Sequence, residues 1–141
     1  ALGTGKEPKK SSIRTDGTRQ IVEVLQASGE RPLIVALSSL GVGDSQQQMP
    51  FYWRWILNLM LGRAFSDHGQ QELVLRASPL PYTILRPTFM NDKAGMGQTK
   101  MTTAPEKANV TPSLSRTDVV AFALRAIEQP EHHPRTVALT A

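Results

Sequence analysis

The stretch QELVLRASPLPYTILRPTFM, residues 71–90, decides the fold of this 141-residue chain. Its first residues complete the apolar face of a helix, and Pro79 and Pro81 end that helix and turn the chain. Residues 82–85 then favour a short strand, because aromatic and β-branched side chains prefer extended backbone. Ligands of open α/β sheets bind outside the carboxyl ends of the strands, so we expect residues 86–91 to contact a bound molecule.

The first half of the chain supplies another helix and another strand. Thr15 or Asp16 is predicted to cap a helix that runs to about residue 28, where Gly29 ends it. Residues 32–37 follow as an unbroken apolar run, the pattern of a parallel strand covered on both faces. The helix carries one apolar stripe, made of Ile21, Val22, Val24 and Leu25.

Helices continue after a polar loop. Residues 51–65, from Phe51 to Phe65, form a predicted helix that is apolar on more than one side. Residues 67–77 form a second helix, and a short strand is expected near residues 101–103. The excess apolar surface of residues 51–65 is compatible with a homodimer or assembly contact, a lid over a pocket, or an ordinary core helix.

The last helix begins with a capping box, in which the carboxylate of Asp118 reaches back to the amide of Ser115. A final strand is expected over residues 135–140. This order predicts an α/β fold, a parallel sheet with helical crossovers. No glycine-rich G-x-G-x-x-G turn occurs in the sequence.

Composition and charge bound the classes of function. The net charge is +4, and basic residues concentrate before residue 20, where no aromatic side chain accompanies them. A solvated basic loop explains this better than nucleic-acid binding. The chain has no cysteine, and no histidine and carboxylate set has metal-site spacing. The most apolar run, residues 55–61, is far shorter than the roughly 20 residues of a membrane span. We therefore expect a soluble, cytoplasmic protein with no membrane or nucleic-acid partner.

Six short pieces of sequence occur in a set order along nearly the whole chain. They are LGT at 2–4, GTRQIV at 17–22, ALSS at 36–39, the segment from DH at 67–68 to LRAS at 75–78, RP at 86–87 and LSRTD at 114–118. Together they resemble the atypical short-chain dehydrogenase/reductases of the NAD(P)H-binding, NmrA-like group, most closely the biliverdin reductase and flavin reductase branch. The chain looks like the carboxyl-terminal two thirds of such a protein. The resemblance therefore implies a partial Rossmann-like, doubly wound parallel sheet, with residues 1–141 as the carboxyl-terminal part of one NAD(P)-binding domain. The amino-terminal nucleotide-binding βαβ unit of that domain would be absent from this sequence, which has no glycine-rich turn.

This resemblance implies a Rossmann-type fold that binds NADP or NAD and passes hydride to a small-molecule acceptor, such as a flavin, a quinone or a linear tetrapyrrole. It also implies a set of cofactor contacts near the strand ends. Gly3 and Thr4 would lie near the ribose and pyrophosphate, Ser38 and Ser39 near the nicotinamide, and Arg86, Pro87 and Thr88 beside it, the last two against its carboxamide.

Two candidate catalytic residues and two candidate substrate contacts follow. Ser39 would orient the acceptor or the cofactor; alternatively, its hydroxyl bonds only to the strand-exit backbone. His68 would donate a proton near neutral pH; alternatively, it is a surface histidine after a capping aspartate. Phe89 stands where the branch carries a histidine, which favours an apolar or stacking substrate contact there, together with Met90.

The family's general catalytic pair is missing. A tyrosine and a lysine four residues apart would hold and donate a proton, but the matching positions are Ala64 and His68. Two further hypotheses therefore stand beside the reductase. One is a non-catalytic Rossmann-like scaffold or assembly subunit, and the other is a redox sensor that binds NADPH without turnover.

Overall fold

The computed structural model describes residues 12–141 except 98, 104–105, 107, 109–112 and 131–134, and it leaves out the side chains of 57, 58 and 60–64. Within these residues the chain forms three α-helices, a short 3-10 helix and six strands. The helices are α1 Ile13–Ser28, η1 Gly43–Gln48, α2 Phe51–Ala77 and α3 Arg116–Glu128. The strands are β1 Ile34–Leu37, β2 Tyr82–Pro87, β3 Met90–Asn91, β4 Lys100–Thr102, β5 Leu114–Ser115 and β6 Thr136–Thr140.

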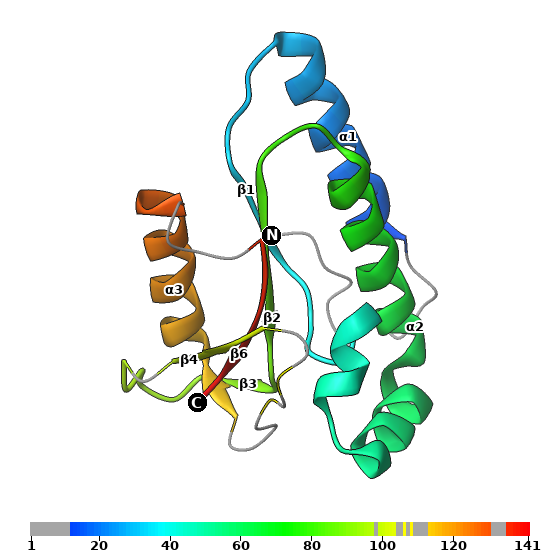
Figure 1. Cartoon of the computed structure of the whole chain (residues 1–141), viewed down its shortest axis with the longest axis vertical. Coiled ribbons are helices and arrows are strands. Elements are labelled where there is room, and N and C mark those ends of the chain that lie inside the picture. The colour runs from blue at the N-terminus through cyan, green and yellow to red at the C-terminus, as the bar shows by residue number, and fades with distance from the viewer. Residues whose placement is uncertain (1–11, 98, 104–105, 107, 109–112, 131–134) are drawn as a thin grey trace.

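The main sheet has the order β1-β2-β6-β4. The first three strands are parallel, with Leu37 opposite Leu85 and Leu85 opposite Val137, and β4 is antiparallel to β6. Strands β3 and β5 form a separate parallel pair. Helices α1 and α2 cover one face of the main sheet and α3 covers the other (Figure 1). The prediction of a Rossmann-like, doubly wound α/β fold is confirmed.

The two faces of the sheet are packed differently. The α3 face is a continuous apolar cluster, whose buried members are Leu85, Leu114, Val119, Phe122, Ala126, Val137 and Leu139. The α1 and α2 face has a smaller apolar cluster, whose buried members are Val22, Ala36, Leu75, Leu80 and Ile84. A third apolar cluster is made of Leu40, Met49, Ala108 and Ala138, with Trp53 and Phe65 of α2 packed against it. Buried polar and charged groups, among them Glu72 and Arg86, lie between the strands and α2.

Helix α1 corrects the predicted stripe. Its buried side chains are Thr15, Thr18 and Val22, whereas Ile21 and Val24 are exposed. The threonines face α2 because they bond to it: Thr15 donates from its backbone amide and its hydroxyl to Asp67 Oδ1 (3.1 and 2.7 Å). The helix also begins earlier than predicted, with Ser12 in the cap position and Gly29 ending it at φ 77° as expected.

The two helices predicted over residues 51–65 and 67–77 are one helix. Asp67 looked like a cap, but its carboxylate accepts hydrogen bonds from α1 instead of from its own helix. Helix α2 therefore continues without a break for 27 residues and stops at Ala77, before the predicted prolines. Within the described part of the chain, no helix combines the length and the apolarity needed to cross a bilayer.

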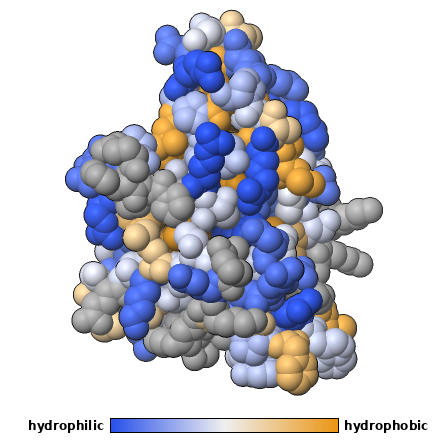
Figure 2. Space-filling view, in the orientation of Figure 1, coloured by the Kyte–Doolittle hydropathy of each residue, from blue (hydrophilic) through white to orange (hydrophobic). Residues whose placement is uncertain are grey.

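The first turns of α2 expose large apolar side chains. Phe51 is 82% exposed, Trp55 72% and Leu59 75%. Figure 2 shows this lower end of the molecule, where hydrophobic atoms reach the surface over the start of α2. On this chain the ordinary-core interpretation of residues 51–65 is therefore wrong for these turns.

The last third agrees with the predicted elements but not with the predicted cap. Ser115 does cap α3, since its hydroxyl oxygen accepts from the amide of Thr117 (3.2 Å). The reciprocal bond of a capping box is not made. The carboxylate of Asp118 accepts instead from the amides of Met96 and Gly97, at 3.1 and 3.0 Å. Asp118 thus fastens the loop after β3 to the start of α3.

Candidate functional site

Three parallel strands end side by side at one edge of the main sheet. The amide of Leu40 donates to the carbonyl of Pro87 (3.0 Å), and the amide of Thr88 donates to the carbonyl of Leu139 (3.0 Å). These bonds continue the pairing past the last strand residues, so Ser39 and Thr88 leave the sheet on neighbouring strands. This carboxyl edge is where ligands of open α/β sheets bind.

Thr88 is the residue of this edge whose side-chain hydroxyl lacks a hydrogen-bond partner among the described residues. Its side chain is buried, at 8% exposure, and its hydroxyl has no hydrogen-bond partner among the described residues. A buried hydroxyl without a partner costs free energy, and native structures rarely keep one without a reason. A polar group of a bound molecule would supply the missing partner, so the edge fits a ligand that can donate or accept a hydrogen bond at Thr88.

The loop after β1 passes close to other side chains. Gly41 has φ 97°, and a Cβ atom there would lie 3.1 Å from Met49 Sδ and 3.2 Å from a ring carbon of Phe65. The backbone amide of Gly41 donates a hydrogen bond to Ser45 Oγ at 2.9 Å. Glycine at this position therefore lets the loop turn tightly against α2 and fixes the path of the chain beyond Ser39.

The hydroxyl of Ser39 bonds locally. It donates to the carbonyl of Leu40 at 3.2 Å, and the side chain is half-buried. This is the backbone bond that the alternative interpretation of Ser39 expects. The orienting role of Ser39 stays a prediction.

A buried ionic network lies behind the edge, between the strands and α2. Arg86 donates to Glu72 twice, from Nε to Oε1 (2.9 Å) and from Nη2 to Oε2 (2.6 Å). Ser38 Oγ also donates to Glu72 Oε1 (2.7 Å), and Arg86 Nη2 lies 2.7 Å from Asp44 Oδ1. We call these four residues the Glu72 network. It ties the ends of β1 and β2 to the same turn of α2.

The electrostatics of the Glu72 network favour the ionised forms. Burial alone would lower the pKa of Arg86, but its bonds to Glu72 and Asp44 outweigh burial and raise it. Burial alone would raise the pKa of Asp44, but the hydrogen bond and the charge of Arg86 outweigh burial and lower it. Both groups therefore remain charged across the physiological range.

The Glu72 network changes how two predicted cofactor contacts are understood. The polar atoms of Ser38 and Arg86 point toward α2 and are already bonded there. Their contact with a cofactor stays a prediction, and their observed role is to position the strand ends. Sequence reasoning missed Glu72 and Asp44, because a glutamate in a helix and an aspartate in a polar loop both look like solvated residues.

His68 lies at the contact between α1 and α2. Its Nδ1 atom is 3.3 Å from Oε1 of Gln71, whose own amide donates to Thr18 Oγ1 at 3.2 Å. Burial, and next the charge of Arg14, lower the pKa of His68. A lowered pKa leaves the imidazole neutral at pH 7, which weighs against the predicted proton donor. No contact among the described residues joins His68 to Ser39.

The two predicted substrate contacts face different surroundings. Phe89 is half exposed, and its ring lies 6.2 Å from that of Trp53 at an angle of 54°. Met90 belongs to β3, opposite Leu114 of β5, and packs against the α3-face cluster. Phe89 therefore presents an aromatic surface near the carboxyl edge, and Met90 supports the strand pair below it.

The remaining predicted site residues have the following status. Gly3 and Thr4 lie outside the described residues. Pro87 ends β2 and is buried, with its carbonyl oxygen bonded to Leu40. No group of three histidines or carboxylates that could hold a metal ion occurs among the residues that the structure describes.

The fold and this edge define a nucleotide-binding α/β domain of the Rossmann type. Residues 1–130 match the NAD(P)H-binding family, and the chain belongs to that family. This match agrees with the NAD(P)H-binding character that the sequence resemblance implies. Binding of NAD(P) is the property that defines this family.

Solved structures with the same fold support this assignment. ChuY of Escherichia coli O157:H7, described as an anaerobilin reductase, has a TM-score of 0.76 at 21% identity, over 94% of this chain and 60% of that one. ChuY of E. coli CFT073 has a TM-score of 0.75 at 22% sequence identity, and the match covers 90% of this chain and 65% of that one. A short-chain dehydrogenase/reductase of Veillonella parvula in complex with NADP has a TM-score of 0.77 at 19% sequence identity, and the match covers 93% of this chain and 60% of that one. The present chain thus spans less than two thirds of these proteins.

Proposed function

We propose that the protein is an NAD(P)H-dependent reductase that passes hydride to a flavin, a quinone or a tetrapyrrole-like acceptor in the cytoplasm. The observation that carries this proposal is the buried, unpartnered hydroxyl of Thr88 at the carboxyl edge. Membership of the NAD(P)H-binding family supports it, and so does the description of one structural neighbour as a reductase.

When bound, the cofactor supplies the hydride, and the protein supplies position and surroundings. Thr88 would bond to a polar group of the nicotinamide end, and Ser39 on the neighbouring strand would orient the cofactor or the acceptor. The Glu72 network keeps the two strand ends at fixed separation. A rigid edge of this kind favours hydride transfer, because the rate depends steeply on the alignment of the two reactants.

The acceptor would lie against the aromatic surface of Phe89. A half-exposed phenyl ring beside Trp53 offers stacking area to a flat conjugated molecule. The positions of the family's tyrosine and lysine pair hold Ala64 and His68, and burial and the charge of Arg14 lower the pKa of His68, so it is neutral at pH 7. We therefore expect acceptors that take up hydride without a strong acid from the protein.

The test is Thr88→Val in the full-length protein, with NADPH binding followed by the fluorescence of Trp53 and Trp55. Valine keeps the shape but removes the hydroxyl. Loss of one hydrogen bond should weaken NADPH binding about tenfold, whereas the unliganded protein should gain up to about 1 kcal/mol of stability. Affinity should fall while stability rises, because the hydroxyl of Thr88 has no hydrogen-bond partner until the ligand binds.

Thr18→Val is the matched control. Thr18 is also a buried threonine, but its hydroxyl already accepts a bond from Gln71. This variant should lose stability by about 1 kcal/mol and bind NADPH as the unaltered protein does. Unchanged binding in Thr88→Val would contradict the proposed site and favour the non-catalytic scaffold. Tight NADPH binding without oxidation by any flavin, quinone or tetrapyrrole tested would favour the redox sensor.

We also propose a second copy of the chain as the partner of the exposed turns of α2. Phe51, Trp55 and Leu59 follow one another at helical spacing, and so large an apolar stripe is uncommon on a monomer. Trp55→Ser should weaken dimerisation about a hundredfold in sedimentation equilibrium. Val120→Ser, which alters an exposed apolar residue of α3, should leave the association unchanged. A monomeric unaltered protein at high micromolar concentration would contradict this proposal.

A further inference from the structure

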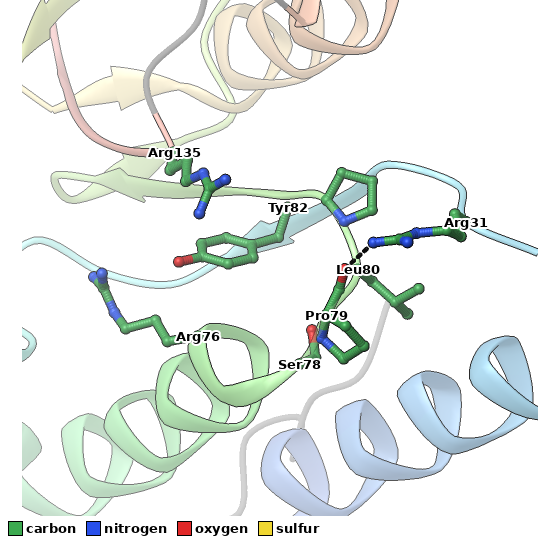
Figure 3. Close-up of a pocket in the computed structure, with 8 residues that line it drawn as sticks. Arg31, Arg76, Ser78, Pro79, Leu80, Tyr82 and Arg135 are labelled. Carbon is green, nitrogen blue, oxygen red and sulfur yellow. Dashed lines mark hydrogen bonds between the residues drawn. The ribbon is translucent and has the colours of Figure 1, made fainter.

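A second cavity lies at the opposite end of the main sheet, where the chain enters β1, β2 and β6. Its volume is about 450 Å³, a size that admits a small organic ligand. The walls come from the turn at residues 78–81, from Tyr82 and from three arginines, Arg31, Arg76 and Arg135 (Figure 3). Among the residues that the structure describes, no acidic side chain lines it.

The three arginines come from parts of the chain that are far apart in sequence. Arg31 precedes β1, Arg76 lies in the last turn of α2, and Arg135 directly precedes β6. Parallel strands begin at a common edge, so the topology gathers these residues in one place. Figure 3 shows the three side chains arranged around Tyr82 and the turn before it.

Protein contacts hold each guanidinium group but leave most of its donors unused. Arg31 Nη2 donates to the carbonyl of Pro79 (2.6 Å), and Arg76 Nη2 donates to Thr136 Oγ1 (3.2 Å). Arg135 lies over the ring of Tyr82, with Cζ 5.7 Å from its centre. Each guanidinium carries five N–H donors, so several per side chain remain for a ligand.

The positive charge of the cavity is poorly compensated. Within the described part of the chain, neither Arg31 nor Arg135 forms an ion pair with a carboxylate. Arg76 is 3.5 Å from Glu72, but that carboxylate already accepts two closer bonds from Arg86. An anion inside the cavity would therefore relieve the repulsion among three nearby cations.

We infer that this cavity binds the phosphate group of a small molecule. Guanidinium groups bind phosphate and carboxylate with paired bonds, but one arginine already satisfies a carboxylate. Three arginines lining one cavity match the greater charge and the extra oxygens of phosphate. Leu80 and the neighbouring prolines give an apolar wall for the remainder of the ligand.

This arginine cavity is separate from the carboxyl edge. Tyr82 begins β2 and Thr88 follows its last residue, so the two sites are about 20 Å apart along a strand that rises about 3.3 Å per residue. Loss of one site should therefore leave binding at the other intact, and the two proposals can fail independently.

The test is calorimetric titration of the full-length protein with inorganic pyrophosphate at low salt. The double variant Arg31→Gln with Arg135→Gln should weaken binding by about a hundredfold, since each charged donor contributes about tenfold. Arg125→Gln is the matched control, because Arg125 also lies over a ring, that of Phe122 at 5.6 Å, but outside the cavity. This control should bind pyrophosphate as the unaltered protein does.

Malonate, a dianion with carboxylates only, distinguishes the class of ligand. We expect it to bind at least about tenfold more weakly than pyrophosphate, because it has fewer acceptor oxygens. Equal binding of the two anions would overturn the phosphate assignment. Absence of pyrophosphate binding, or an equal loss in Arg125→Gln, would overturn the site itself. Thermal unfolding of each variant verifies that the exposed substitutions leave the fold intact.

Discussion

The two faces of the main sheet hold their helices by different means. Helix α3 lies on a wholly apolar cluster, in which Leu85, Phe122 and Leu139 are buried without a charged neighbour in that cluster. Helix α2 lies on the other face through the Glu72 network, and it is joined to α1 through Asp67. Apolar contacts are tolerant of small displacements, whereas hydrogen-bonded ion pairs require a set geometry. The polar face is therefore the one that fixes where β1 and β2 end.

The largest expected effect comes from Glu72→Gln. It leaves the guanidinium of Arg86 buried with only Asp44 as a charged partner, and breaking a buried ion pair typically costs about 3–5 kcal/mol. Chemical denaturation should report a loss of that size.

The double variant Glu72→Leu with Arg86→Leu is the informative companion. It removes both charges at once, so it should be more stable than either single leucine substitution. If the losses of unfolding free energy in the two single variants simply add in the double variant, Glu72 and Arg86 act separately. That outcome would contradict the view that an ion pair holds this face of the sheet.

A somewhat smaller loss is expected on the apolar face. Leu85→Ala removes a fully buried side chain from the α3 cluster and leaves a cavity, which should cost about 3 kcal/mol. Unlike Glu72→Gln, it should not alter NADPH affinity, because no strand-end contact is lost. Fluorescence titration alongside denaturation measures both quantities, and a matching loss of affinity would show that the apolar face also positions the carboxyl edge.

The smallest effect concerns pH. Burial alone would raise the pKa of Asp67, but hydrogen bonds from Thr15 and then Arg14 outweigh burial and lower it. A folded pKa below the unfolded value of about 3.9 stabilises the fold above that pH, and the stabilisation disappears as the pH falls through the folded pKa. Asp67→Asn should therefore cost roughly 2 kcal/mol at pH 7 and progressively less below pH 4.

The unaltered protein is compared with Asp67→Asn across this pH range. His68 also contributes, because burial and Arg14 lower its pKa, so stability is lost as the pH falls below about 6.5. The charge of Asp67 raises the pKa of His68, so Asp67→Asn alters this contribution too, and the Asp67 carboxylate is assessed below pH 4. A difference that stays constant from pH 7 to pH 3 would contradict the role given to the Asp67 carboxylate.

Sequence patterns predicted the apolar face well. The spacing of Val119, Phe122 and Ala126 sets the buried side of α3, and the runs at β2 and β6 have strand length. These signals are local, because hydrophobic burial requires only that apolar residues recur at the period of the element. The same reasoning placed Ser39 and Thr88 at a shared strand edge.

The polar face was not predictable in this way. Thr15 and Thr18 replace aliphatic residues at the buried positions of α1, and Asp67 resembles a helix cap although it sits mid-helix. Their partners are more than fifty residues away, and no local pattern encodes such a distance. Glu72 and Asp44 were missed because a glutamate in a helix and an aspartate in a polar loop both look like solvated residues. The unpartnered state of the Thr88 hydroxyl likewise emerges only from the assembled fold.

Helix α2 is much longer than the sheet beneath it. Its 27 residues extend about 40 Å at about 1.5 Å each, whereas the six residues of β2 extend about 20 Å. Among the residues of α2 whose side chains the structure describes, the buried ones are Asp67, Gln71, Glu72 and Leu75, all in the second half of the helix. The turns that expose Phe51, Trp55 and Leu59 should therefore have a lower free energy of local opening than the turns around Leu75. A molecule that binds these first turns would add its binding energy where the helix opens most easily.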